Sequence, residues 1–116
     1  MRLSYQTPLW FYPMPVDFRR QIDGLMIVVA DQLERIPTSG ELFIFRNRKF
    51  DKIKLLWYER NGFWLCYRRL EAGRFQYPIE SSTVMELNHD QLSWLLSGLD
   101  ITQLTPLPSV TASRFY

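Results

Sequence analysis

The chain has 116 residues, 47% of them hydrophobic and 16% aromatic, which predicts one packed globular domain and excludes a disordered chain. Its single cysteine, Cys66, excludes an internal disulfide, and no cysteine and histidine residues have zinc-ligand spacing. The net charge of +2 conceals an asymmetry, because residues 46–74 contain nine basic and three acidic side chains. This asymmetry bears on partners rather than on the fold.

We expect a cytoplasmic protein with no membrane contact, because neither a signal peptide nor a long apolar segment is recognisable. The N-terminus has no charged stretch followed by an apolar run. The longest apolar run, residues 25–30, is far too short to span a bilayer.

The N-terminal part of the chain predicts an extended segment and then a helix. Residues 1–16 include three prolines, which argue against a helix, and an aromatic run at positions 10–12. We predict an extended arm or an edge strand near residues 9–12, with its aromatic side chains covering apolar surface on a sheet. A helix should follow from Asp17, its N-cap, to residue 36, where Pro37 stops it.

The middle of the chain predicts strands, because β-branched and aromatic runs alternate there with turn residues. The predicted strands are residues 42–46, 52–59 and 63–70, followed by short strands near 75–77 and 83–87. A short helix should begin at Asn88, since Gln91 stands in the capping-box position and Leu87 and Leu92 form a hydrophobic staple. Gly98 closes it.

These elements predict an α+β fold. We expect a mostly antiparallel four- to five-stranded sheet, with one long helix packed on one face and a short C-terminal helix. Residues 1–101 should form a single domain with a proline-rich N-terminal arm. Residues 102–116 should be an extended or disordered tail.

The dipeptide Asn61-Gly62 is the strongest hairpin signal, because both positions of a two-residue loop need φ > 0. With this loop, the opposed residues are Tyr58 with Leu65, Trp57 with Cys66, Leu56 with Tyr67, and Lys54 with Arg69. The face that carries Trp57 is nearly all apolar, and we predict that it is the core side. The other face mixes apolar residues with cations.

Six basic residues are candidates for binding a phosphate backbone. They are Arg46, Arg48, Lys49 and Lys52 at the tip of the first hairpin, with Lys54 and Arg69 on the sheet. An opposed Lys54–Arg69 pair would cost stability unless an anion lay nearby. That anion could be a phosphate, or a carboxylate of the protein itself such as Asp51 or Glu71.

The same face offers an apolar patch as a candidate surface for a protein partner or a second copy. The patch consists of Leu56, Tyr58, Leu65 and Tyr67. One long helix cannot cover both faces of such a sheet. The other face should therefore be covered by the N-terminal arm, the short helix or a second subunit.

The sequence favours a protein without catalytic, metal-binding or cofactor-binding residues. His89 is the only histidine and is expected in the first turn of the short helix, where a structural role is the common one. Cys66 has no histidine partner in sequence, and a buried, inert thiol is expected. A phosphate-binding glycine loop and a strand-borne carboxylate cluster are both missing.

Four segments appear in order and with compatible spacing: DFRRQIDGL (17–25), SGELFIFRNR (39–48), KIKLLWYERNGFWLCYRRLEAGRF (52–75) and LNHDQLSWLLSGLDI (87–101). They resemble the TnpB accessory proteins encoded by the second open reading frame of insertion sequence 66 elements, which share only a name with RNA-guided nucleases. Residues 1–16 and those beyond 101 lie outside the resemblance. Tyr77 stands where family members often have tryptophan.

The resemblance implies a protein needed for efficient transposition beside a separate, larger transposase, and it brings no established catalytic residues. Two hypotheses for its mechanism follow. The protein binds DNA, such as the transposon ends, through the basic hairpin surface. Alternatively, it is a protein–protein adaptor or a homo-oligomeric assembly factor that never contacts nucleic acid.

Overall fold

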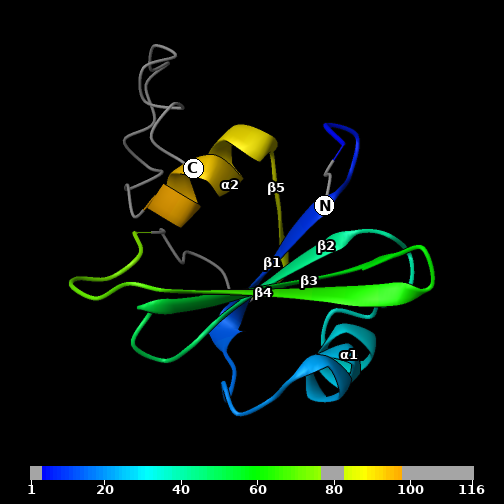
Figure 1. The fold of residues 1–116 in the computed structure, drawn as a ribbon, viewed down its shortest axis with the longest axis horizontal. Coiled ribbons are helices and arrows are strands. Elements are labelled where there is room, and N and C mark those ends of the chain that lie inside the picture. The colour runs from blue at the N-terminus through cyan, green and yellow to red at the C-terminus, as the bar shows by residue number, and fades with distance from the viewer. Residues whose placement is uncertain (1–3, 77–82, 98–116) are drawn as a thin grey trace.

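The computed structural model describes residues 4–76 and 83–97. The elements are, in chain order, β1 (Leu9–Pro15), α1 (Ile22–Asp31), β2 (Leu42–Arg46), β3 (Lys52–Glu59), β4 (Gly62–Arg69), β5 (Met85–Leu87) and α2 (His89–Ser97). The strands form one five-stranded sheet in the order β4-β3-β2-β1-β5. Figure 1 shows α1 and α2 on opposite sides of this sheet. The α+β class is as predicted, and the sheet is mixed.

The N-terminal segment is extended as predicted, but it forms an interior strand, so the prediction of an arm or an edge strand was wrong. β1 pairs parallel with β2 and antiparallel with β5. Its prolines are tolerated because the β5 pairing spans only residues 9–11, and the β2 register is irregular between Phe11 and Pro15. The chain between the parallel strands β1 and β2 crosses over through α1.

The first helix covers only Ile22–Asp31, so the predicted helix over residues 17–36 was too long at both ends. At its start, Asp17 accepts a hydrogen bond from the backbone N–H of Arg19, and a turn replaces helix. At its end, Glu34 adopts φ +55°, and the N–H of Arg35 bonds back to the carbonyl of Val29. A left-handed residue of this kind terminates a helix.

Both faces of the sheet are buried, each under one helix. On the α1 side the buried cluster consists of Leu25, Val28, Val29, Leu33, Phe43, Phe45 and Leu56. On the α2 side it includes Leu9, Phe11, Leu42, Ile44, Ile53, Trp57, Leu92 and Leu95. The expectation that a second element is needed to cover both faces is confirmed, and that element is the short helix α2, which covers the face of Trp57. The prediction that only the Trp57 face is the core side was incomplete, because α1 buries Leu56 on the other face.

The β3–β4 hairpin has Arg60-Asn61 as its loop, with φ values of +49° and +67°, and Glu59 is paired with Gly62. The predicted loop, Asn61-Gly62, was therefore wrong, because the observed loop begins one residue earlier. This moves each residue of β3 to a partner two positions earlier in β4 than predicted. Trp57 lies opposite Trp64 and Tyr58 opposite Phe63. Because the shift is even, the predicted division of the residues between the two faces is unchanged.

The C-terminal part of the described chain follows the prediction in part. Asn88 accepts a hydrogen bond from the N–H of Gln91 at 2.7 Å, and the Gln91 side chain accepts one from the N–H of Asn88 at 2.8 Å, so the capping box is confirmed. The strand expected at 83–87 is the shorter β5. Residues 74–76 are not in a strand. Tyr77, Gly98 and residues 102–116 lie outside the described residues.

Candidate nucleic-acid interface

The loop between β2 and β3, residues 47–51, is fixed by one asparagine. The Asn47 side-chain oxygen accepts hydrogen bonds from the N–H groups of Asp51 at 3.1 Å and Lys52 at 3.0 Å. Its amide nitrogen donates to the Asp51 carboxylate at 2.6 Å, and this bond holds the pKa of Asp51 below its usual value. The loop therefore has a defined shape, with Arg48 and Lys49 exposed at its tip.

A second segment of chain lies against this loop. After β4 the N–H of Leu70 donates to the carbonyl of Asp51 at 2.8 Å, and the N–H of Phe75 donates to that of Phe50 at 2.7 Å. The Phe75 ring is buried beside Phe50, with ring centroids 6.1 Å apart. These contacts bring Arg74, which the sequence did not single out as a site residue, to the same end of the sheet.

Basic residues from both segments gather at this end, which we call the basic end of the sheet. It comprises Arg48, Lys49, Lys52, Arg68, Arg69 and Arg74. The register places Arg69 opposite Lys52 and Arg68 opposite Ile53, so the like-charge pair of the sheet is Lys52–Arg69. Sequence reasoning missed Arg68 because its place depends on the β3–β4 register, and Arg74 because its place depends on the bonds of Leu70 and Phe75 to the loop.

Two carboxylates lie within the basic end. Arg69 forms an ion pair with Glu71 at 2.9 Å, and Lys52 lies 3.8 Å from Asp51. Each cation of the Lys52–Arg69 pair thus has a carboxylate of the protein nearby. This is one of the two explanations expected for an opposed pair of cations, the other being a bound phosphate. Among the described residues, the recorded ion pairs include no carboxylate partner for Arg48, Lys49, Arg68 or Arg74.

Arg46 has an internal role at the base of the loop. Its Nε donates to the carbonyl of Pro13 at 2.8 Å, and its guanidinium lies over the Phe50 ring at 5.2 Å from the centroid. Burial lowers its pKa, and the neighbouring charge of Arg48 adds to this effect. The side chain therefore ties the loop to the end of β1.

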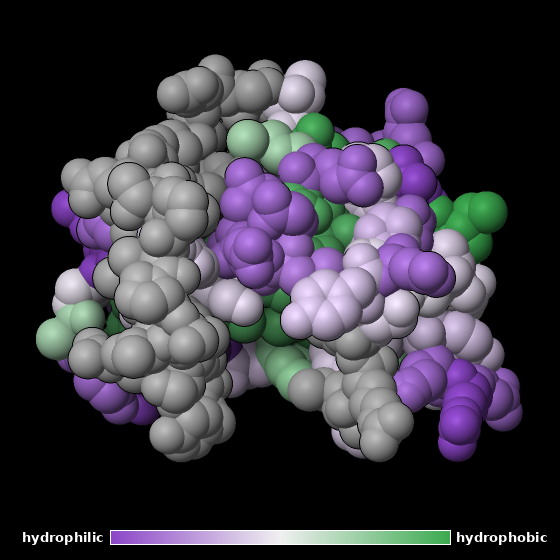
Figure 2. Space-filling view, turned by 90° about the horizontal axis from the view of Figure 1, so that it is seen from above, coloured by the Kyte–Doolittle hydropathy of each residue, from purple (hydrophilic) through white to green (hydrophobic). Residues whose placement is uncertain are grey.

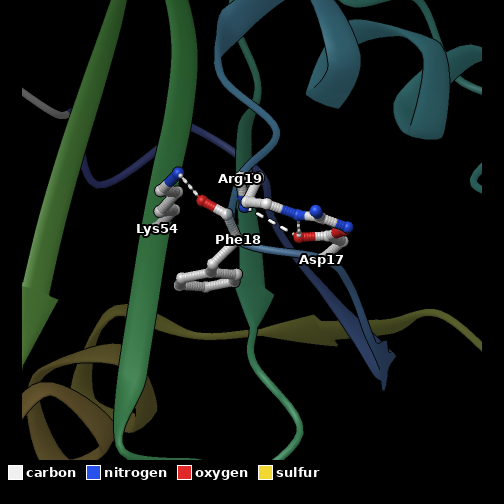
Figure 3. Close-up of polar contacts among 4 residues, drawn as sticks. All are labelled: Asp17, Phe18, Arg19 and Lys54. Carbon is white, nitrogen blue, oxygen red and sulfur yellow. Dashed lines mark hydrogen bonds and ion pairs between the residues drawn. The ribbon is translucent and has the colours of Figure 1, made fainter.

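Lys54 is buried, with 4% of its surface exposed, and it lies opposite Tyr67 rather than opposite Arg69 as predicted. Its Nζ donates to the carbonyls of Phe18 at 2.9 Å and Arg20 at 2.7 Å, and the first bond is drawn in Figure 3. Burial lowers the pKa of this amine. The charge of Lys54 is thus directed at the turn before α1.

That turn is organised by an exposed ion pair. The Asp17 carboxylate accepts hydrogen bonds from the Arg19 side chain, including one from Nη2 at 2.6 Å, and from the Arg19 N–H at 2.9 Å (Figure 3). The Arg19 side chain, its backbone N–H and its charge together lower the pKa of Asp17 to about 2. The fold of this turn presents the two carbonyls that Lys54 binds.

The four residues of the apolar patch do not form one exposed surface. Leu56 is fully buried in the α1-side cluster, and Leu65 packs partly buried against it. Tyr58 is half-buried, with its ring centroid 5.1 Å from that of Phe63. Tyr67 remains 52% exposed while packing edge-on against Phe18. Because α1 covers the centre of the patch, only Tyr67 offers a large accessible area.

The two side chains that could act as a base or a nucleophile, His89 and Cys66, lie far apart in the described part of the chain. His89 follows β5 at one side of the sheet, where its Nε2 is 3.3 Å from the carbonyl of Thr7, whereas Cys66 lies on β4 at the other edge. Residues 4–76 and 83–97 contain no group of three or more His, Cys, Asp or Glu side chains that could hold a metal ion. In the same residues no helix has the length and apolar character needed to cross a membrane.

The class of protein follows from the comparison with family models. Residues 7–106 match the family described as "IS66 Orf2 like protein", so this is an insertion-sequence accessory protein. The chain belongs to the IS66 Orf2-like family, which confirms the resemblance seen in the sequence.

Two relatives come from Sinorhizobium fredii. The uncharacterized protein y4jC is 32% identical over 94 residues, covering 81% of this chain and 80% of y4jC. The uncharacterized protein y4hO is 34% identical over 92 residues, covering 79% and 80%. No solved structure shows significant similarity to the chain.

Proposed function

We propose that this protein is a non-catalytic accessory factor of transposition that binds DNA, such as the transposon ends, through the basic end of the sheet, beside a separate transposase. The observation that carries the proposal is the gathering of Arg48, Lys49, Arg68 and Arg74, which are exposed and have no recorded carboxylate partner among the described residues. They come from two segments that the backbone bonds of Phe50 and Asp51 hold together.

Exposed cations on a fixed loop suit a phosphate backbone. Phosphate contacts position a protein on DNA without reading its sequence, and each releases a bound counterion. Arginine guanidinium groups bind phosphate oxygens through two parallel hydrogen bonds. Lys52 and Arg69 can also contact phosphates at little cost, because exposed ion pairs such as Arg69–Glu71 are screened by solvent and contribute little stability.

The surface proposed here differs from the six candidate residues in two of its members. Arg46 and Lys54 hold the loop and the α1 turn through backbone carbonyls, so we assign them structural roles. Arg68 and Arg74 take their places at the basic end. The excess of positive charge at this end of the sheet still supports the proposal. The predicted opposition of Lys54 and Arg69 does not, because Lys54 lies opposite Tyr67.

We predict that the double variant Arg48→Gln with Lys49→Gln binds DNA more weakly than the parent protein. Each lost phosphate contact should reduce the slope of log K against log salt concentration by about 0.9, so the double variant should lose about 2. Affinity should fall by a similar factor for transposon-end and unrelated duplexes. Fluorescence anisotropy titrations across a salt series measure both quantities.

Arg60→Gln is the matched control. Arg60 is exposed and carries the same charge, but it lies in the β3–β4 loop at the opposite end of these strands. It should change neither the slope nor the affinity beyond the general effect of net charge. If the double variant binds with the parent's slope, or if Arg60→Gln weakens binding equally, the basic end is not the DNA surface.

The adaptor remains the second candidate function, because Tyr67 and Trp64 on β4 are 52% and 47% exposed. Exposed aromatic residues are enriched in protein interfaces. If the parent protein shows no salt-dependent DNA binding, capture of purified transposase, reduced by Tyr67→Ser, would support an adaptor instead.

A further inference from the structure

Within the described residues, β4 forms a long edge of the sheet with no strand paired on its outer side. β4 contains eight residues, whereas the strand at the opposite edge, β5, contains three. β4 runs across the front of the sheet in Figure 1. Most of its side chains are exposed or half-buried, and none of its residues is a proline. An edge of this length is a template for pairing with another strand.

The backbone groups that face outward can be assigned from the hairpin. In a two-residue hairpin the residues flanking the loop, here Glu59 and Gly62, exchange hydrogen bonds, and the pattern then alternates along the strands. The N–H and C=O groups of Phe63, Leu65, Tyr67 and Arg69 therefore point away from β3. Within residues 4–76 and 83–97 the structure records no backbone partner for these four residues.

The β4 edge is also regular. The β3–β4 register runs without a bulge from Lys52–Arg69 to Glu59–Gly62. Edge strands that avoid pairing are usually short, bulged or interrupted by proline. β4 has none of these features, and its charged side chains are confined to Arg68 and Arg69 at its end.

We propose that β4 pairs edge to edge with β4 of a second copy of this chain, antiparallel and about a two-fold axis at Cys66. The product is a continuous ten-stranded sheet across two copies, and the outward groups of β4 bond to their counterparts in the second copy. Two-fold symmetry makes the interface isologous, so each contact occurs twice.

The side chains select this register. With Cys66 opposite Cys66 of the second copy, Trp64 lies opposite Arg68 and Phe63 lies opposite Arg69. Each cation then meets an aromatic ring rather than another cation, which favours pairing. Leu65 lies opposite Tyr67, so the two apolar residues that face α1 also meet. Centring the axis one residue earlier would place Arg68 opposite Gly62, where there is no side chain to contact.

Charges beyond the strand ends agree with an antiparallel arrangement. Arg60 is exposed just before β4, and Glu71 is exposed just after it. Antiparallel pairing about Cys66 brings the Arg60 end of one copy to the Glu71 end of the other. A parallel arrangement would instead place like charges together at both ends, at a cost in stability.

The cysteine gives a direct test of the register. The backbone N–H and C=O of Cys66 point toward Leu55 of β3. Opposite Cys66 of the second copy it would therefore form a non-hydrogen-bonded pair, with Cα atoms about 4.5 Å apart. That distance lies within the range of a disulfide. Mild oxidation with copper phenanthroline, at a concentration where sedimentation shows a dimer, should give a covalent dimer that a reductant reverses. Cys66→Ser should dimerise but form no covalent species.

Charge exchange tests the side-chain contacts. Trp64→Lys places a lysine opposite Arg68 of the second copy at two symmetric positions and should weaken the dimer by about tenfold or more. The double variant W64K/R68E replaces these like-charge contacts with opposite-charge ones and should recover at least half of the loss in log Kd. Sedimentation velocity over a concentration series, without DNA, gives the dissociation constants, and circular dichroism confirms that the variants fold.

A parent protein that stays monomeric up to several hundred micromolar would overturn the proposal. A dimer that resists oxidation at Cys66 would overturn this register, as would a double variant no tighter than Trp64→Lys. Because the parent experiments need no substitution, they decide the matter even if a variant fails to fold.

Discussion

Lys54 uses its charge inside the protein, where it joins the sheet to the turn before α1. Its Nζ donates to the carbonyls of Phe18 and Arg20, and it lies 5.0 Å from the centroid of the Phe18 ring. The stem of a lysine is apolar, so it can cross the α1-side face and deliver its charge at the end. A basic residue in a basic segment is therefore part of the fold here.

We predict that Lys54→Met lowers the free energy of unfolding by about 1–3 kcal/mol, because methionine fills similar space but leaves two carbonyls without their donor. Lys49→Met, at the exposed loop tip, should change it by no more than about 0.5 kcal/mol. Urea unfolding monitored by tryptophan fluorescence measures both. Equal stabilities of the two variants would show that the carbonyl contacts contribute nothing net.

At the scale of the element, the β3–β4 hairpin shows which force selects a register. Arg60 at φ +49° is costly by roughly 1 kcal/mol, since L residues other than glycine disfavour the left-handed region. The observed register gains a Trp57–Trp64 pair and a Tyr58–Phe63 pair, with centroids 6.2 Å and 5.1 Å apart. Such pairs contribute about 0.5–1.5 kcal/mol each. Together they contribute about 1–3 kcal/mol, which is enough to offset the cost of Arg60 in the loop.

Substitutions in this loop should report the observed register. Arg60→Gly should raise the free energy of unfolding by about 0.5–1 kcal/mol, because glycine adopts positive φ freely. Gly62→Ala should be within about 0.5 kcal/mol of the parent. Gly62 lies in β4, outside the residues with positive φ, and a Cβ there would meet no heavy atom closer than 4.0 Å. Chemical denaturation gives both values, and a large loss on Gly62→Ala would favour Asn61-Gly62 as the loop.

This hairpin also shows how far the sequence could predict the structure. Alternation along the strands divided the residues correctly between two faces, because an even shift of register preserves that division. It could not choose between registers two residues apart, which differ only in cross-strand contacts. The sequence also could not predict that Arg74 belongs to the basic end, because a backbone bond between Phe75 and Phe50, distant in sequence, places it there. The capping box at Asn88 was predictable because it is local.

At the scale of the whole molecule, one sheet separates two buried clusters. Leu25 from α1 and Leu95 from α2 are both fully buried, one in each cluster. Seen from the α2 side in Figure 2, the described surface is mostly hydrophilic, with green areas small and separate. The short helix therefore completes the core as much as the first helix does.

We predict that Leu25→Ala and Leu95→Ala each lower the free energy of unfolding by about 2–5 kcal/mol, because each leaves a cavity in a closed cluster. Both should keep a single cooperative transition, with circular dichroism and tryptophan fluorescence coinciding. A Leu95→Ala protein that lost only α2, while the sheet melted at the parent's midpoint, would show that α2 is peripheral.

The position of β1 in the middle of the sheet has a consequence for how the protein is made. β1 leaves the ribosome before the other described strands, but its antiparallel neighbour β5 lies at Met85–Leu87. Its parallel neighbour β2 can pair with it only after α1 has been synthesised. During translation the edge of β1 that pairs with β5 therefore stays open while the local β3–β4 hairpin can already close. One edge of β1 thus stays unpaired until the chain has been synthesised as far as β5.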